Sequence, residues 1–158
     1  AKLARITSVD AMPGSQVLAG EIIVFGRRGS GGSFRNGFFS ETWRVRLDDR
    51  LTWADTLLLN DPKNGALHHP AGFDGAVAMA TAIYLGPDAS MHLDLARNLI
   101  SCTGDLVKSS ATIVNGVLVI RFLGRETFSL RTAFGLFWQN FRHGVSGLPA
   151  KMPRLWEM

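Results

Sequence analysis

The sequence run with the clearest potential for chemistry extends from Phe25 to Phe34 and reads FGRRGSGGSF. A glycine-rich loop holds a phosphate when its backbone N–H groups converge, and the phosphate-binding loop has the pattern G-x-x-x-x-G-K-[ST]. Counting from Gly26, the sixth position is Gly31, but Gly32 and Ser33 follow it, so the required lysine is missing. A strand-like sequence comes next, which provides no helix N-terminus for an anion. We therefore interpret the run as a connection between two strands, in which glycine allows positive φ.

The residue types that most often bind metals are represented by four histidines and one cysteine. They are His68, His69, His92, Cys102 and His143. No H-x-x-x-H or C-x-x-C spacing occurs among them, so the sequence specifies no closed metal site. The aspartates and glutamates are scattered, and no spacing indicates a nucleophile beside a base. The sequence therefore predicts no catalytic residue, no metal site and no tightly bound cofactor.

Length and composition indicate a single folded domain over residues 1–158. A chain of 158 residues that is 46% hydrophobic and 19% charged can bury a substantial core. It lacks an apolar run of the roughly 20 residues that span a bilayer, and its start, AKLARITSVD, lacks the apolar segment of a secretory signal. A single cysteine is typical of a reducing compartment. These features predict a cytoplasmic protein without a membrane partner.

The basic character of the chain favours an acidic partner. The formal net charge is +4, from 17 basic and 13 acidic residues, and 13 of the basic residues are arginine. Guanidinium groups suit two-point contacts with carboxylates or phosphates. Arginines interleaved with aromatic residues also fit a nucleic-acid surface, but Arg44 and Arg46 alternate with Trp43 and Val45, as in a strand with one solvated face. We therefore favour an acidic protein partner and keep nucleic acid as the alternative.

Alternation of apolar and polar residues, bounded by turn residues, predicts a mainly β fold. The expected strands cover residues 16–25, 38–47, 51–60, 75–85 and 113–123. The second and third strands form a hairpin around residues 48–50, and residues 61–71, which include two prolines, form a loop. The last strand contains Asn115 and Gly116, which mark either a hairpin turn or a bulge.

Two helices are expected in the second half of the chain. One covers residues 88–101, where apolar residues recur at four-residue spacing from Met91. The other is longer, covers residues 127–142 and ends at Gly144. Its apolar face consists of Leu130, Phe134, Phe137, Trp138 and Phe141, which we interpret as core packing. The predicted fold class is mainly β, with layered sheets and two α-helices, the longer one near the C-terminus.

Several short blocks occur in a fixed order along the chain. They include EIIVFGR, FRNGFF, RLTWAD and RFLG, then a helix with the pattern L-R-x-x-F-x-x-x-W-x-x-x-R, and finally P-R-L-W. In type and order these blocks resemble the urease accessory protein family UreD, also called UreH. The matching positions are Phe25, Gly26, Arg27, Gly31, Gly37, Arg121, Gly124, Leu130, Arg131, Trp138, Arg142, Pro153, Arg154 and Trp156.

The resemblance covers essentially all of this chain but only the C-terminal part of a family member. It implies a β-helical or layered β scaffold with two helices, so the chain is expected to be part of a longer scaffold. One position departs from the family pattern G-R-x-x-x-G-E, because Gly32 stands where the family has glutamate. Any role of that carboxylate with a metal or a partner is lost or relocated in this sequence.

By the same resemblance, the chain is expected to be a non-enzymatic assembly factor for urease. Members of the family bind the accessory protein UreF, which recruits the GTPase UreG, and the complex docks on the urease apoprotein. Nickel is then delivered to urease along a water-filled passage through the scaffold. The resemblance thus implies nickel in transit only, and structural or partner-binding roles for the matching residues.

Overall fold

The computed structural model describes residues 2–25, 37–60, 65–101 and 103–156. The strands are β1 (Lys2–Ala11), β2 (Val17–Val24), β3 (Phe38–Leu47), β4 (Arg50–Leu59), β5 (Ala78–Leu85), β6 (Val107–Val114) and β7 (Val117–Gly124). The helices are α1 (Gly65–His68), α2 (Leu93–Ile100) and α3 (Thr127–Ser146), with 3₁₀ turns η2 (Ala89–His92) and η3 (Arg154–Trp156). The predicted mainly β fold with a longer helix near the C-terminus is confirmed.

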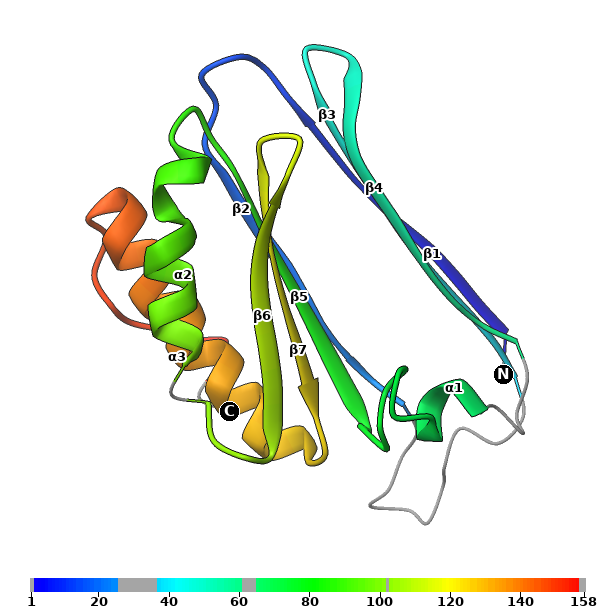
Figure 1. Cartoon of the computed structure of the whole chain (residues 1–158). Helices are drawn as coiled ribbons and strands as arrows, with labels where there is room; N and C mark the ends of the chain where they lie inside the picture. Colours follow the sequence, from blue (N-terminus) through cyan, green and yellow to red (C-terminus); the bar gives the residue numbers. More distant parts are fainter. Residues whose placement is uncertain (1, 26–36, 61–64, 102, 157–158) are drawn as a thin grey trace.

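The strands form two sheets that are stacked face to face, and helices α2 and α3 cover the outer face of one sheet (Figure 1). The strand order is β1-β3-β4 in the three-stranded sheet and β2-β5-β7-β6 in the four-stranded sheet. Strands β1 and β3 are parallel, whereas the other neighbouring pairs are antiparallel. The result is three layers: a sheet, a second sheet and a helical layer. Within the described ranges, no helix is long and apolar enough to cross a membrane.

Two hairpins turn through pairs of residues with positive φ. Asp48 and Asp49 (φ 53° and 59°) connect β3 to β4, and Asn115 and Gly116 (φ 48° and 81°) connect β6 to β7. Two consecutive positive φ values characterise type I′ turns, whose twist matches that of the flanking strands. The structure therefore decides between the two alternatives for residues 115–116 in favour of a hairpin turn.

The strand predictions agree closely with β2, β3, β4 and β5, but three elements, β1, β6 and α1, were missed or misplaced. Strand β1 was not predicted, because the inward positions of its sequence include Arg5 and Thr7 and so break the apolar alternation. The predicted strand 113–123 merges the end of β6 with β7. Residues 65–68 of the predicted loop form α1, a single helical turn.

Helix α3 continues past the predicted stop at Gly144 and ends at Ser146. Gly147 follows in the left-handed conformation (φ 65°) and its N–H donates to the carbonyl of His143. Gly144 instead serves packing, because a Cβ at this position would lie 2.6 Å from Leu95 Cδ2 of helix α2. The glycine that looked like a helix stop in the sequence is a contact point between two helices.

The predicted aromatic face of α3 does pack on the four-stranded sheet. Leu130, Phe134, Phe137 and Phe141 are buried, and Trp138 is half-buried. Small residues of the sheet allow this close approach, notably alanines at positions 78, 80 and 82 of β5 and Gly20 of β2. A Cβ at Gly20 would lie 2.8 Å from Trp138 Cζ3 and 3.0 Å from Phe134 Cζ. Glycine at position 20 is therefore required by the packing of α3.

The predicted first helix begins as the 3₁₀ turn η2 before it becomes α2. This change of helical phase turns Met91 outward, and its side chain is exposed, so its assignment to the apolar stripe was wrong.

At the start of this helix, the side chains of three residues form a hydrogen-bonded chain. The hydroxyl of Tyr84 donates to Asp88 Oδ1 at 2.9 Å, and His92 Nε2 lies 2.8 Å from Asp88 Oδ2.

We expect the free energy of unfolding to fall at alkaline pH because Tyr84 ionises there. Burial raises the pKa of Tyr84 from 10.0 to about 12, and the hydrogen bond and charge of Asp88 add to this effect. The folded state therefore keeps a proton that the unfolded state loses, so stability is complete below pH 10 and falls as the pH rises toward 12. Urea unfolding of Tyr84→Phe at successive alkaline pH values should show a smaller decline than the wild type. Equal declines would contradict the assignment, since the chain has one tyrosine.

Candidate functional site

The space between the two sheets contains two apolar clusters, one toward each end of the strands. Near the β3–β4 turn, the cluster includes Trp43, Val45, Trp53, Ile83 and Val119. Toward the other end, the cluster consists of Ile23, Phe25, Phe39, Leu59 and Met79. Polar side chains occupy the strand positions between these clusters, and they form the candidate functional site.

These residues, here called the polar layer, take one or two inward positions from each strand. The polar layer consists of Arg5, Thr7, Glu21, Glu41, Asp55, Thr81, Ser110 and Arg121. In the four-stranded sheet, Glu21 lies opposite Thr81, which lies opposite Arg121. Ser110 continues the row on β6, so polar residues cross all four strands at one level.

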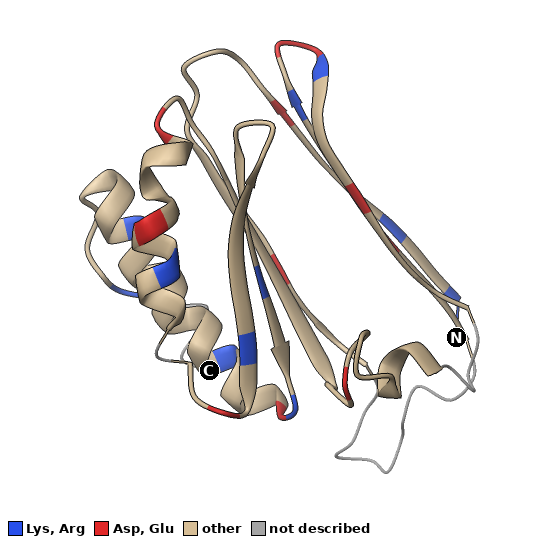
Figure 2. Cartoon of the chain, in the orientation of Figure 1, with Lys and Arg blue, Asp and Glu red and all other residues tan. Residues whose placement is uncertain are grey.

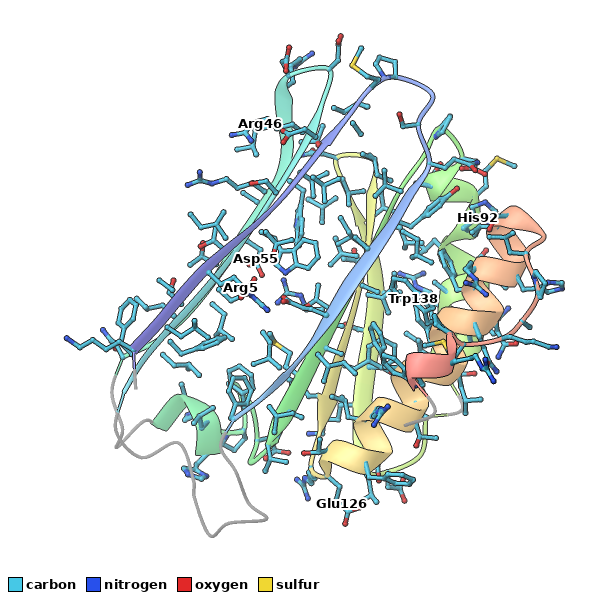
Figure 3. The ribbon with its side chains drawn as sticks, turned by 180° about the vertical axis from the view of Figure 1, so that it is seen from behind. Arg5, Arg46, Asp55, His92, Glu126 and Trp138 are labelled. Carbon is cyan, nitrogen blue, oxygen red and sulfur yellow. The ribbon has the colours of Figure 1, made fainter. Side chains whose placement is uncertain are left out.

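The three-stranded sheet supplies the facing half of the polar layer. Arg5 of β1 lies opposite Glu41 of β3, and Asp55 of β4 lies opposite Trp43, two residues further along β3. Figure 3 shows the side chains of Arg5 and Asp55 in the space between the two sheets. Both sheets thus place charged groups at the same level, where ion pairs can join them.

A pair of glutamates, Glu21 and Glu41, shares one guanidinium across the two sheets. Arg5 Nε donates to Glu41 Oε2 at 2.5 Å, and Arg5 Nη2 donates to Glu21 Oε2. Each carboxylate also accepts a second hydrogen bond. The indole N–H of Trp43 donates to Glu21, and the hydroxyl of Thr7 donates to Glu41. Glu41 is only 2% exposed, whereas the Arg5 side chain is 45% exposed at the margin of the sandwich.

This arrangement leaves negative charge incompletely neutralised. Burial raises the pKa of Glu21 above its ordinary value of 4.5, and the negative charge of Glu41 raises it further. The hydrogen bond from Trp43 lowers the pKa of Glu21, and so do the charge and the hydrogen bond of Arg5. Together they offset only part of the rise. Ionised Glu21 therefore costs stability at neutral pH, and shifted pKa values of this kind cluster at functional sites.

A second ion pair lies at the other side of the polar layer. Arg121 of β7 donates to Asp55 of β4, and this contact again joins the two sheets. Beside it lies a pocket of about 440 Å³ between the edge strands β4 and β6. Its wall combines apolar Leu57 and Met79 with the polar layer and with Lys108. The polar layer therefore extends from Arg5 on the β1–β2 side to this pocket on the β4–β6 side.

The described residues contain no group of three or more histidine, cysteine, aspartate or glutamate side chains placed to hold a metal ion. The ligands that the polar layer offers to a cation are the carboxylates of Glu21 and Glu41 on one side and of Asp55 on the other. Carboxylate oxygens are ligands for divalent cations in general.

The structure separates the family-motif residues into two groups, of which one belongs to the space between the sheets. Phe25 is buried there, and its ring makes edge contacts with Phe39 and Phe73. Arg121 is a member of the polar layer. Gly37 is half-buried directly before β3. The motif residues Gly26, Arg27 and Gly31 lie outside the described residues, as do Gly32 and Cys102.

The second group surrounds α3. Gly124 ends β7 beneath Leu130, since a Cβ there would lie 2.7 Å from Leu130 Cβ. Arg131 donates to the carbonyl of Trp156 and stacks over its indole ring at 5.2 Å. Arg142 donates to the carbonyls of residues 149 and 151. These bonds hold residues 147–156 along α3, and we call this arrangement the tail clasp.

Trp156 completes the tail clasp by packing on α3. Its ring stacks with that of Phe134 at 6.0 Å, and a Cβ at Gly135 would lie 2.7 Å from Trp156 Nε1. The ring of Trp138, one helical turn further along α3, also packs against the ring of Phe134, at 5.6 Å between ring centroids. Pro153 and Arg154 are exposed. The motif residues of this group that make packing or hydrogen-bond contacts within the chain are Gly124, Leu130, Arg131, Trp138, Arg142 and Trp156.

Sequence reasoning missed the polar layer, although each strand carries a signal for it. In β2 the inward positions are Val17, Ala19, Glu21 and Ile23, so a single acidic residue interrupts an apolar series. The same interruption occurs once in β5 at Thr81 and once in β7 at Arg121. One polar residue in an otherwise apolar inward series, repeated in several strands, is the pattern that could have revealed it.

Architecture and site together define a helix-backed module of two β-sheets with an ionic layer between them. The chain belongs to the UreD family: a family model described as "UreD urease accessory protein" matches residues 1–157. The family description is that of an accessory protein of urease, which agrees with the resemblance drawn from the motifs.

Individual relatives support the same assignment. The urease accessory protein UreD of Magnetococcus marinus is 37% identical over 160 residues, which cover 99% of this chain and 55% of the relative. The UreD protein of Methylobacterium sp. is 36% identical with the same coverage, and that of Granulibacter bethesdensis is 34% identical over 99% of this chain and 64% of the relative. The chain therefore spans about half to two thirds of the length of these curated relatives.

Proposed function

We propose that this chain acts as a scaffold in urease maturation and that nickel passes through it as cargo. Its partners in this proposal are the accessory proteins UreF and UreG and the urease apoprotein. Membership of the UreD family supports the role in urease assembly. Because the relatives are longer than this chain, the partners and the cargo are proposals for the part that the chain represents.

The polar layer is the observation that carries this proposal. A cation crossing the sandwich needs oxygen ligands at intervals and surroundings that do not already balance their charge. Glu21 and Glu41 supply two negative charges against the single positive charge of Arg5. Asp55 supplies a further carboxylate at the pocket on the opposite side, where Arg121 balances its charge, so the excess of negative charge lies at Glu21 and Glu41. The layer thus offers carboxylates in sequence from one margin of the two sheets to the other.

The distribution of charge on the surface bears on how partners bind. Figure 2 shows lysines and arginines of the described segments interspersed with acidic residues over the sheets and helices. Ion pairs such as Arg46–Asp10 and Lys108–Asp74 neutralise several of the basic groups locally. This mixed surface favours a protein partner with matching charges of both signs over the uniform phosphate backbone of nucleic acid.

Co-expression with urease apoprotein, UreF and UreG tests the proposal. We expect the chain to raise urease activity in nickel-containing medium, and the double variant Glu21→Gln/Glu41→Gln to lower the activity toward that of cells without the chain. The substitutions keep the shape of the side chains but remove both negative charges. Capture of UreF in a pull-down should be unchanged, because the polar layer lies between the sheets.

The matched control is Glu126→Gln, which removes an exposed carboxylate at the start of α3. This control should activate urease as well as the wild type does. If the double variant also activates urease fully, nickel does not use the polar layer. If the folded wild-type chain neither captures UreF nor raises urease activity, the scaffold proposal fails.

A further inference from the structure

Helix α3 carries a buried hydrogen-bond donor that the tail clasp leaves unsatisfied. Among the described residues, Arg142 Nε is the one buried side-chain nitrogen or oxygen atom without a hydrogen-bond partner. Nη2 of the same guanidinium donates to two carbonyls, that of Pro149 at 2.9 Å and that of Lys151 at 2.6 Å. A buried donor without an acceptor lowers stability, and it does so more strongly on a charged group. Residues 147–156 therefore satisfy Arg142 incompletely.

A carboxylate suits Arg142 better than main-chain carbonyls do. The Nε–H and one Nη2–H point the same way along one edge of a guanidinium, at the spacing of the two oxygens of a carboxylate. The segment 147–156 reads GLPAKMPRLW, so it contains no aspartate or glutamate and carries two cations, Lys151 and Arg154. Its charge is the opposite of the charge that Arg142 is best suited to bind.

The same face of α3 has a slot for one indole ring. A Cβ at Gly135 would lie 2.7 Å from Trp156 Nε1, and the three atoms nearest to that Cβ all belong to the ring of Trp156. Phe134 stacks with this ring at 6.0 Å, and the guanidinium of Arg131 lies over it at 5.2 Å. The absence of a side chain at position 135 therefore makes room for a flat aromatic ring between these two neighbours.

Apart from this ring, little holds the segment 147–156, which doubles back beside α3 (Figure 1). Residues 147–151, 153 and 154 are exposed. The hydrogen bonds from Arg131, Arg142 and His143 all lead to main-chain carbonyls, which any extended segment can offer. Segments with few buried apolar contacts open locally while the rest of a protein stays folded. Residues 147–156 can therefore leave α3 without unfolding the sheets.

We infer that this face of α3 is a binding site for an acidic peptide segment of another protein that carries one tryptophan. Residues 147–156 occupy the site until such a segment displaces them. The tryptophan of the partner enters the slot over Gly135, and a carboxylate of the partner accepts two hydrogen bonds, from Nε and Nη2 of Arg142. The site lies on the helical layer and the polar layer lies between the sheets, so peptide binding here is independent of the proposed nickel route.

Fluorescence anisotropy with two labelled synthetic peptides tests the site. One peptide has the sequence of residues 147–156, and the other, the acidic peptide, carries Lys151→Glu and Arg154→Glu. The acidic peptide should bind the 158-residue chain with Trp156→Ala roughly tenfold more tightly than the wild type, whose tethered segment competes. It should also bind the Trp156→Ala chain roughly tenfold more tightly than the unaltered peptide does, because it supplies a carboxylate to Arg142. The acidic peptide with alanine in place of its tryptophan should not bind.

Substitutions added to the Trp156→Ala chain assign the contacts. Gly135→Ala should weaken binding of the acidic peptide by roughly tenfold, because the new Cβ occupies the slot, while alanine itself favours the helix. Arg142→Lys keeps the positive charge but lacks the two-point edge, so the two peptides should bind this variant with similar affinity. Leu136→Ala changes an exposed residue of α3 outside the clasp and serves as the control that leaves binding unchanged. Circular dichroism shows that each variant is folded.

Failure of the acidic peptide to bind the folded Trp156→Ala chain would overturn the inference. Equal affinities of this peptide for the wild type and for Trp156→Ala would place it elsewhere on the surface and so would count against the site as well. The same holds for binding that survives Gly135→Ala or loss of the peptide's tryptophan, for a preference for acidic residues that Arg142→Lys leaves intact, and for binding that Leu136→Ala abolishes.

Discussion

Phe137→Ala is expected to lower the free energy of unfolding by about 3–5 kcal/mol, because it empties a fully packed site under helix α3. The Phe137 side chain is 2% exposed and lies between the four-stranded sheet and the helical layer. Its ring stacks with Phe141 at 5.2 Å and contacts Phe122 at 5.5 Å. The rings of Phe122 and Phe141 are themselves fully buried in the same core and cannot readily move in to fill the space. Thermal unfolding should shift downward by roughly 10 °C for a domain of this size.

The same helix offers a control of identical chemistry. Phe128 is 80% exposed on α3, so Phe128→Ala makes the same change of residue type without opening a cavity. Its effect should stay within about 0.5 kcal/mol. Comparable losses from both variants would show that helix propensity, and not burial under α3, determines the result. Urea unfolding followed by circular dichroism gives both values.

Arg5→Ala is expected to cost about 2 kcal/mol at pH 7, because it leaves Glu21 and Glu41 without their shared cation. Removing one partner of a fully buried ion pair costs roughly 3–5 kcal/mol, but the Arg5 side chain is 45% exposed and water replaces part of its contribution. The loss should shrink as the pH falls from 7 toward the ordinary glutamate pKa value of 4.5. The reason is that the pKa of Glu21 is already raised by burial, and protonation removes the need for a cation.

Arg46→Ala is the matched control for this result. Arg46 lies on β3 of the same sheet, and its ion pair with exposed Asp10 is long, at 3.4 Å. An ion pair in this setting contributes about 0–1 kcal/mol, so the control should be nearly neutral at both pH values. Equal losses from the two variants would contradict the assignment of the polar layer as a buried ionic site. A loss from Arg5→Ala that is independent of pH would contradict the role given to Glu21.

Much of the fold could be predicted from sequence because its signals are local. The β3–β4 hairpin combines clear alternation with a two-residue aspartate turn, and α3 displays its aromatic face over many residues. Where local signals served tertiary packing, prediction failed. Gly144 looked like a helix stop but accommodates Leu95. Met91 fitted the stripe of an ideal helix, but the chain begins that helix with a 3₁₀ turn.

The candidate site was hidden for a different reason. Each member of the polar layer looks like an isolated polar residue in its own strand, and only the register of seven strands brings them to one level. Register between sequence-distant strands, such as the pairing of Arg5 with Glu41, has no local signal. The blocks of the family resemblance did include Glu21, Asp55 and Arg121, but not Arg5 or Glu41. Motifs thus marked members of the site without showing what they contact.

The order of the strands has a consequence for how the molecule folds. Parallel strands β1 and β3 are neighbours in one sheet, yet β2 between them in sequence belongs to the other sheet. The three-stranded sheet cannot be completed before the chain has passed through the other sheet as β2. The contacts that complete the two sheets join residues far apart in sequence, such as Arg5 and Glu41, which are 36 residues apart. Such long-range closure slows assembly and makes it cooperative. The two sheets should therefore form, and melt, as one unit.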